Sequence, residues 1–118
     1  MNNNKIKGKK GEEIAAKFLL DKGFEILEMN YYASRYGEID IIAKDGNTLV
    51  FCEVKARSTQ AFGHPLEAIT HAKIQKMQKA ISFYLMQKNP KTKNYRIDAI
   101  SIVFSPKLEI LHIENIFQ

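Results

Sequence analysis

Residues 37–57 read GEIDIIAKDGNTLVFCEVKAR, and this stretch decides the fold. Two runs rich in β-branched and aromatic residues flank Asp45-Gly46-Asn47, a composition typical of a tight turn. The pattern predicts two antiparallel β-strands joined as a hairpin. Three charged residues, Asp40, Glu53 and Lys55, stand among residues that favour burial. Because a buried charge costs several kcal/mol unless it is paired or metal-bound, these charges must compensate one another or hold a cation.

The turn decides whether Asp40 and Glu53 share a face of the hairpin. If Gly46-Asn47 forms a two-residue loop, with Gly first as in a type II′ turn, Asp40 lies directly opposite Glu53. If Asp45-Gly46 forms the loop, Asp40 lies opposite Phe51, which is on the same face as Glu53. Only a three-residue loop without a compensating bulge separates the two acids. Both two-residue registers bring the carboxylates together, and a divalent cation between them would relieve their repulsion.

This arrangement suits metal-assisted hydrolysis of a phosphodiester. Carboxylate oxygens are ligands for Mg²⁺, which retains waters and accepts a phosphate oxygen of a substrate. Such a metal lowers the pKa of a bound water and stabilises the developing charge. Lys55 lies on the same face as Glu53, where it can orient the water or neutralise the phosphate. The E-x-K spacing occurs by chance in many strands, so the adjacent Asp40 carries most of the specificity.

The whole chain has the size of one domain. Its 118 residues are 45% hydrophobic, which suffices for a single core. No apolar run approaches the roughly 18 residues of a membrane span, and the N-terminus lacks the apolar segment of a signal peptide, so a cytoplasmic location is expected. The single Cys52 excludes an internal disulfide and argues against a thiolate zinc site. The net charge of +5 is compatible with a polyanionic partner such as nucleic acid.

Helices and further strands are predicted on both sides of the hairpin. The predicted segments are a flexible basic arm over residues 1–10, a helix over 11–22, a basic-aromatic connection over 33–36, strands over 24–32, 95–104 and 108–113, and a helical pattern over 66–88 that Thr70 could break and cap. This gives an α/β fold, a mixed sheet flanked by helices in the order α-β-β-β-α-β-β, within one domain over residues 1–118.

The charges on the two predicted helices each allow two interpretations. Glu12 falls within the apolar arc of its helix, where it either favours the helix dipole or points inward toward the strand acids. Lys73, Lys76 and Lys79, with Gln75 nearby, lie opposite an apolar stripe. They form either a solvated face or a row of phosphate contacts.

Three other polar residues have simpler expectations. His64, in the loop over residues 58–65, is expected to be a surface histidine, with a phosphate contact as the alternative. Asp98 stands in an apolar strand and is expected to be edge-facing or paired. His112, on the last strand, is expected to be structural.

The hairpin resembles the signature of the YraN-type bacterial proteins. The likeness continues through Gly11-Glu12, Ala15, Phe18-Leu19 and Gly23-Phe24, then Asn30, Phe62-Gly63, Lys73 and residues 112–117. These proteins resemble archaeal Holliday junction resolvases and thus the PD-(D/E)xK, or restriction-endonuclease-like, nucleases. The resemblance implies that the mixed sheet is restriction-endonuclease-like.

The resemblance also implies roles for individual residues. Asp40 and Glu53 would bind Mg²⁺ or Mn²⁺, Lys55 would be the catalytic lysine, and Glu12 would be the acid of the first helix. The predicted nucleic-acid contacts are Arg57, Lys73, Gln75, Lys76 and Lys79, with Gln75 matching a polar helix position of related resolvases.

Three functions follow as hypotheses. The first is a Mg²⁺-dependent DNA endonuclease that hydrolyses phosphodiester bonds in branched or Holliday-junction-like DNA. The alternative is a non-catalytic nucleic-acid-binding module with a nuclease-like fold, and the third is a structural α/β domain whose acids form ordinary ion pairs. Because a resolvase needs two active sites, a homodimer is expected for the first hypothesis.

Overall fold

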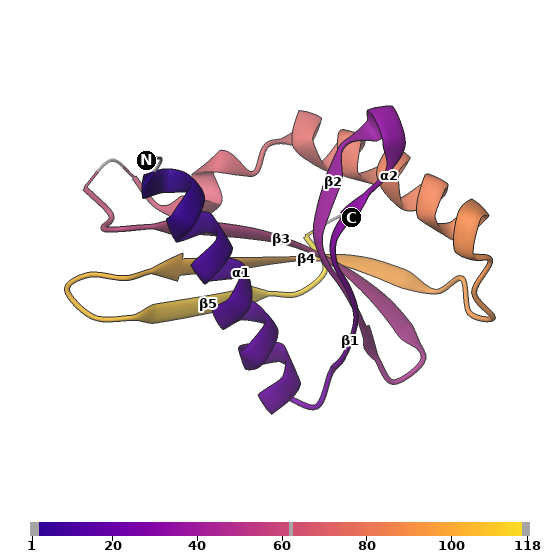
Figure 1. The fold of residues 1–118 in the computed structure, drawn as a ribbon, viewed down its shortest axis with the longest axis horizontal. Helices are drawn as coiled ribbons and strands as arrows, with labels where there is room; N and C mark the ends of the chain where they lie inside the picture. The colour runs from indigo at the N-terminus through magenta and orange to yellow at the C-terminus, as the bar shows by residue number, and fades with distance from the viewer. Residues whose placement is uncertain (1–2, 62, 117–118) are drawn as a thin grey trace.

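Five strands form one mixed sheet with helices packed against its faces (Figure 1). The computed structural model describes residues 3–61 and 63–116. In chain order the elements are α1 (Asn3–Asp21), β1 (Glu25–Tyr32), the 3-10 helix η1 (Ser34–Tyr36), β2 (Glu38–Asp45), β3 (Thr48–Arg57), the 3-10 helix η2 (Pro65–Ala68), α2 (His71–Lys88), β4 (Tyr95–Val103) and β5 (Glu109–Ile113). The strands lie in the order β1-β2-β3-β4-β5, and only the β3–β4 pair is parallel. The predicted fold class and element order are therefore confirmed.

The hairpin adopts the first of the two predicted registers. Asp45 pairs with Thr48, which leaves Gly46-Asn47 as the loop. Gly46 has a φ of 62°, the positive value that the first position of a type II′ turn requires. The turn therefore fixes which residues of β2 and β3 face each other.

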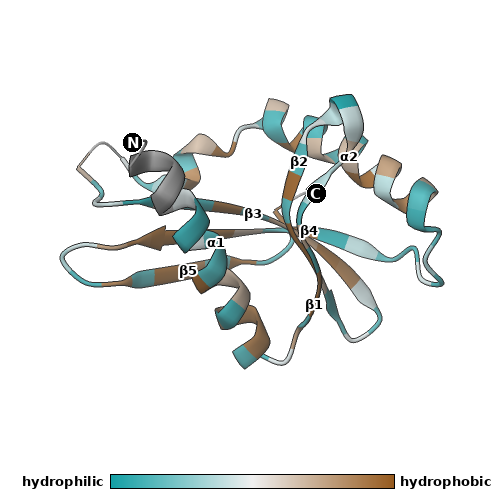
Figure 2. Cartoon of the chain, in the orientation of Figure 1, coloured by the Kyte–Doolittle hydropathy of each residue, from teal (hydrophilic) through white to brown (hydrophobic). Residues whose placement is uncertain are grey.

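Each face of the sheet carries its own hydrophobic cluster, and Figure 2 shows the apolar residues along the strands. Phe51 belongs to the cluster under α2, whereas its neighbour Cys52 belongs to the cluster under α1, as alternation along a strand requires. The predicted apolar stripe of α2 is confirmed, because that helix buries Met77, Ala80, Ile81 and Tyr84.

Burial raises the pKa of the Cys52 thiol, so this cysteine acts as a small apolar residue. Neither long helix in the described ranges is apolar enough to cross a membrane.

The first helix starts earlier than predicted. Residues 3–10 were expected to form a flexible arm but are the first part of α1, while residues 1–2 lie outside the described residues. Apolar periodicity, the signal that placed the start at Gly11, is not needed for a helix to form. The lysines of this segment are good helix formers and no proline interrupts them.

The long helical pattern is broken at Thr70, as predicted. The Thr70 hydroxyl accepts a hydrogen bond from the backbone N–H of Lys73 at 3.2 Å and caps α2.

His64 caps the 3-10 helix η2. Its Nδ1 accepts a hydrogen bond from the backbone N–H of Leu66 at 3.1 Å, and the backbone N–H of His64 donates to Glu67 Oε2 at 3.0 Å. His64 therefore has a capping role in its loop.

Asp98 is completely buried in β4, between β3 and β5. Its carboxylate accepts hydrogen bonds from Arg96 Nε at 3.0 Å, His112 Nε2 at 2.8 Å and the backbone N–H of Asn115 at 2.9 Å. Lys22 Nζ lies 2.8 Å from His112 Nδ1, and because an ammonium only donates, the proton of the neutral ring is on Nε2, facing Asp98. Asp98 is therefore paired, the edge-facing alternative is wrong, and His112 has a structural contact.

Candidate active site

The two strands of the hairpin separate at a fork. Their pairing ends at Ile41 and Cys52, after which β2 continues beside β1 and β3 continues beside β4. Asp40 is the first residue of β2 beyond this point, and its Oδ2 accepts a hydrogen bond from the backbone N–H of Val54 at 2.8 Å. The Asp40 side chain thus bridges the two strands where their backbone pairing stops.

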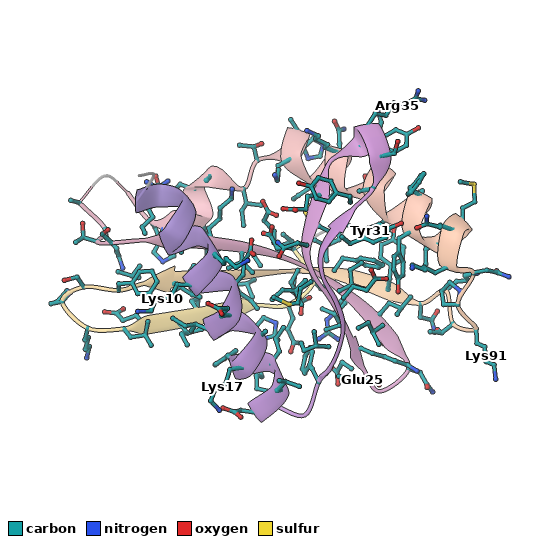
Figure 3. The ribbon with its side chains drawn as sticks, in the orientation of Figure 1. Lys10, Lys17, Glu25, Tyr31, Arg35 and Lys91 are labelled. Carbon is teal, nitrogen blue, oxygen red and sulfur yellow. The ribbon has the colours of Figure 1, made fainter. Side chains whose placement is uncertain are left out.

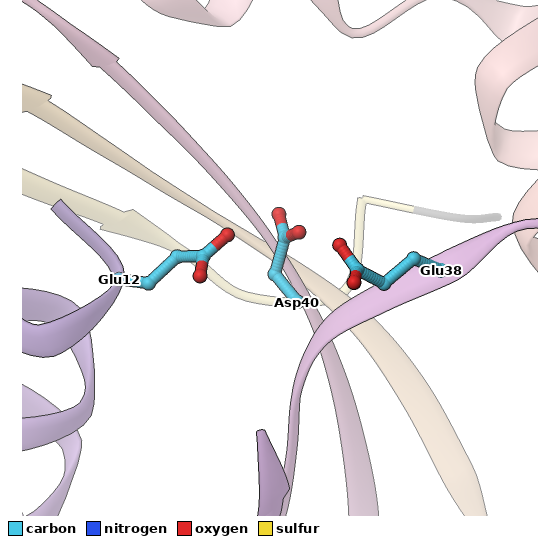
Figure 4. A group of neighbouring side chains, drawn as sticks. All are labelled: Glu12, Glu38 and Asp40. Carbon is cyan, nitrogen blue, oxygen red and sulfur yellow. The ribbon is translucent and has the colours of Figure 1, made fainter. Parts of the chain in front are cut away.

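Three carboxylates converge at the fork (Figure 4). Glu12, Glu38 and Asp40 each place a carboxylate oxygen within 4.8 Å of the others. Glu12 comes from α1, and its Oε1 accepts a hydrogen bond from Asn30 Nδ2 of β1 at 2.8 Å. This bond orients one acid of the cluster.

Close packing of α1 against β3 brings Glu12 to the fork. A β-carbon at Gly11 would lie 2.7 Å from the β-carbon of Ala56, so only glycine allows the helix to approach this closely. Because α1 begins at Asn3, Glu12 lies well inside the helix, and the interpretation of Glu12 as a first-turn acid is wrong.

The charged neighbours of Glu53 include two cations, whereas those of Asp40 are acids. Glu53 is buried in β3 with 3% of its surface exposed, and its Oε2 lies 3.2 Å from Lys73 Nζ and 3.5 Å from Lys55 Nζ. Lys55 comes from the same strand, whereas Lys73 reaches the site from α2. Two ammonium groups therefore share one carboxylate oxygen.

The surroundings of Asp40 disfavour its charged form. Burial is the largest cause and raises the pKa, the charges of Glu53 and Glu12 raise it further, and a hydrogen bond between the Asp40 and Glu53 carboxyls acts in the same direction. The hydrogen bond from Val54 N–H lowers the pKa but does not outweigh them, and the result is a pKa of about 8. Without a bound cation, Asp40 therefore keeps a proton at neutral pH.

These residues fit a divalent cation. The site contains the carboxylates of Glu12, Glu38, Asp40 and Glu53 against the ammonium groups of Lys55 and Lys73, so the formal sum of −4 and +2 is −2 with every acid ionised. The donors are all carboxylate oxygens, the ligand type of Mg²⁺ and Mn²⁺. A cation of charge +2 would replace the proton on Asp40 and neutralise the cluster.

The predicted site residues fall into two groups. Asp40, Glu53 and Lys55 meet at the fork, and Glu12 joins them from α1. Of the predicted nucleic-acid contacts, Lys73 points to Glu53, whereas Gln75, Lys76 and Lys79 are exposed on α2 and Arg57 is half-buried at the end of β3. Lys73 therefore contributes to the site itself in addition to the basic surface of α2.

Sequence reasoning missed Glu38 as a fourth carboxylate. Glu38 lies two residues before Asp40 in the same strand, and alternation along a strand places residues at this spacing on the same face. The sequence therefore contained the signal for a further carboxylate beside Asp40. The connection of Glu38 to Glu12 was hidden, because only the approach of α1 brings these two residues together. Phe62 and Phe117, which carried part of the resemblance, lie outside the described residues.

Comparison with known proteins identifies relatives along nearly the whole chain. The model of the uncharacterised protein family UPF0102 matches residues 11–102. A UPF0102 protein of Persephonella marina is 46% identical over 112 residues, covering 95% of this chain and 93% of the relative. A UPF0102 protein of Clostridioides difficile is 43% identical over 115 residues, covering 98% of this chain and 99% of the relative.

Proposed function

The chain belongs to the uncharacterised protein family UPF0102, a name that states no activity, and from its site we propose that it is a Mg²⁺- or Mn²⁺-dependent DNA endonuclease. One observation carries the proposal. At the fork, the half-buried Asp40 lies beside the buried Glu53, with additional carboxylates near Asp40 and two lysines on Glu53. An acid with a raised pKa, as Asp40 has, gathered with other carboxylates beside cations is typical of sites that bind a metal and act on a phosphate.

Each residue has a role in this proposal. Asp40 and Glu53 would hold the metal, and Glu12 and Glu38 would complete its surroundings directly or through waters. When bound, the metal would lower the pKa of a water and stabilise the negative charge that develops on the phosphate. The hydrogen bond from Val54 N–H fixes Asp40, and β3 buries Glu53, so the two acids are oriented before substrate arrives.

The two lysines would act on the substrate. Their ammonium groups lie on Glu53 in the absence of a metal, and a metal on Glu53 would free them to contact the phosphate. Lys55 would orient the attacking water or stabilise the charged phosphate from β3, and Lys73 would do the latter from α2. An ordinary structural ion pair would account for Glu53, but it would leave the acids around Asp40 without a cation.

Surface charge supports DNA as the substrate. Lys76 and Lys79 are exposed on α2, the helix that also carries Lys73, and the chain has a net charge of +5. Phosphate contacts of this kind supply affinity that falls steeply with salt. The resemblance to resolvases favours branched DNA as the substrate and a homodimer with two active sites. A cytoplasmic location is part of the same proposal.

Metal binding and cleavage test this proposal separately. Mg²⁺ or Mn²⁺ should raise the melting temperature of the wild type by binding the folded state, and Asp40→Asn should lose most of that rise. Asp21→Asn, which changes an exposed aspartate of α1, is the matched control and should keep it. An equal rise in Asp40→Asn would remove Asp40 from the metal site.

Cleavage is then measured on labelled branched, single-stranded and duplex DNA with Mg²⁺, with Mn²⁺ and with EDTA. We expect cuts with either metal and none with EDTA or with Asp40→Asn. DNA binding without any metal-dependent cut would favour the non-catalytic binding module. Neither DNA binding nor a thermal response to metal would favour the structural domain.

A further inference from the structure

An open hollow of about 780 Å³ lies between η1 and α2. Its lining includes Arg35 and Tyr36 from η1, and Lys79, Phe83 and Met86 from α2. Among the described residues that line it there is no carboxylate. The hollow therefore combines positive charge with aromatic surface.

The aromatic rings and the cations lie close together. The ring centroids of Tyr36 and Phe83 are 6.2 Å apart at an interplanar angle of 55°, and the Arg35 guanidinium lies 5.2 Å from the Tyr36 centroid. Both rings are half-buried, so the fold holds them while part of each remains accessible. Arg35 projects from the outer end of the connection between β1 and β2 (Figure 3). Rings beside basic groups are the surface on which unpaired nucleic-acid bases stack while their phosphates are bound.

A second hollow adjoins the first and shares residues with the fork. This smaller hollow is lined by Tyr36, Gly37, Glu38, Lys73 and Lys76. Tyr36 lines both hollows, while Glu38 belongs to the carboxylate cluster and Lys73 contacts Glu53. The residues of the two hollows therefore run from the fork past Lys76 to the rings, the direction in which a bound strand would extend.

We propose that this hollow binds an unpaired nucleotide of the DNA substrate beside the phosphate that is cut. The inference rests on the proposed function and narrows its substrate to DNA with a single-stranded segment at the cleavage site. Bases in a duplex are stacked on their neighbours, so only an unpaired base can offer its face to Phe83 or Tyr36. Arg35 and Lys79 would bind the flanking phosphates.

Binding without metal tests the proposal independently of cleavage. The probes are a fluorescein-labelled oligothymidylate of about 12 nucleotides, within the usual range for single-strand sites, and a blunt duplex, both measured by anisotropy in EDTA. Phe83→Leu removes the ring and keeps an apolar side chain, so it should weaken single-strand binding by roughly 5- to 100-fold. Phe83→Tyr should restore it, and duplex binding should stay within about twofold in both variants.

A second variant avoids the core. Arg35 is exposed, so Arg35→Ala should fold normally and still weaken single-strand binding by roughly 2- to 10-fold through loss of a phosphate contact. Lys107→Ala, in the exposed turn between β4 and β5, is the matched control and should bind like the wild type. An oligouridylate of the same length tests the choice of DNA, and tighter binding of the RNA would overturn that choice.

The outcomes separate this inference from the proposed function. Single-strand binding that is unchanged in Phe83→Leu and Arg35→Ala overturns the nucleotide site, as does an equal loss for single strand and duplex. If both variants lose single-strand binding while the wild type cuts nothing with Mg²⁺ or Mn²⁺, the nucleotide site stands and the endonuclease fails. If the wild type cuts DNA while both variants bind normally, the endonuclease stands and the nucleotide site fails.

Discussion

Asp40 and Asp98 are two acids inside the same sheet, on the strands to either side of β3. Asp98 has no exposed surface, yet its pKa is lowered. Burial alone would raise it, but hydrogen bonds from His112, from the backbone of Asn115 and from Arg96 outweigh burial. Asp40 is less buried, yet its pKa is raised to about 8, because burial and neighbouring acids outweigh its hydrogen bond from Val54.

Partners therefore distinguish these acids better than burial does. The fold supplies Asp98 with every donor that its charge needs, which is the pattern of a structural residue. The fold supplies Asp40 with further acids and leaves its charge uncompensated, which is the pattern of a residue that binds a cation. If this comparison is correct, the same substitution should have different effects at the two positions.

The largest difference should be in stability. Asp98→Asn removes the buried charge that accepts hydrogen bonds from Arg96, His112 and the backbone of Asn115, so the free energy of unfolding should fall by about 3–5 kcal/mol. Asp40 already holds a proton at neutral pH in the folded protein, so Asp40→Asn replaces one neutral group with another and should leave the free energy of unfolding unchanged or slightly higher. Urea denaturation of both variants without metal measures this. Equal losses at the two positions would show that Asp40 is as structural as Asp98.

Loss of Lys55 should affect cleavage rather than folding. Lys55→Ala should cut roughly 10²–10³-fold more slowly, as on loss of one preoriented electrostatic group, with metal binding nearly intact. Lys55→Arg should not restore cleavage, because a guanidinium differs in shape and cannot lose its proton. Single-turnover cleavage and melting temperature are measured on the same samples. A destabilised but fully active Lys55→Ala protein would instead make Lys55 an ion-pair partner of Glu53, equivalent to Arg96 beside Asp98.

A substitution that pushes α1 away from β3 should have a smaller effect on stability and on metal binding. Gly11→Ala places a methyl group against Ala56 and should lower the free energy of unfolding by about 1–3 kcal/mol, as overpacking does. It should also reduce the thermal shift with Mg²⁺, because Glu12 follows Gly11 directly. Gly8→Ala is the matched control in the same helix: apart from its chain neighbours and the helix backbone, nothing lies within 4 Å of a β-carbon there, so it should be neutral or stabilise by up to about 1 kcal/mol. If both variants behave alike, close packing at Gly11 does not position Glu12.

Local patterns in the sequence predicted much of the fold and part of the site. Alternation and turn chemistry limited the hairpin to two favoured registers, and both place Asp40 on the same face as Glu53 and Lys55, so these three residues were identified together. The convergence of separate elements could not be read from such patterns. Glu12 reaches Asp40 only because Gly11 allows α1 to pack closely, and Lys73 reaches Glu53 only because α2 crosses that face of the sheet.

The difference between Asp40 and Asp98 could not be read from the sequence either. Asp98 appears there as an acid in an apolar strand, much like Asp40. Its partners His112 and Asn115 come from β5 and the segment after it, and β5 pairs with β4 only in the fold. Sequence reasoning could therefore not tell a compensated acid from an uncompensated one.

The smallest expected effect is on the pH dependence of the free energy of unfolding. Asp40 and Asp98 should change this free energy in opposite directions as pH rises. The pKa of Asp40 is about 8 in the folded protein and near its usual 3.8 in the unfolded chain. Between about pH 4 and pH 8 the folded state therefore holds a proton that the unfolded chain releases. Through Asp40, the free energy of unfolding should fall as pH rises across this window, by at most about 1.4 kcal/mol per pH unit.

Asp98 contributes to the pH dependence of stability with the opposite sign, because its pKa in the folded protein lies below 3.8. Its contribution is fully present above about pH 4 and is lost as pH falls through the folded pKa. Urea unfolding in EDTA from about pH 3 to pH 9 should therefore give a flatter curve for Asp40→Asn than for the wild type between pH 4 and pH 8. Asp98→Asn should keep the wild-type slope in that window and differ in slope only below it. Parallel curves for Asp40→Asn and the wild type between pH 5 and pH 8 would mean that Asp40 is already ionised in the folded protein, and its environment would then be as well compensated as that of Asp98.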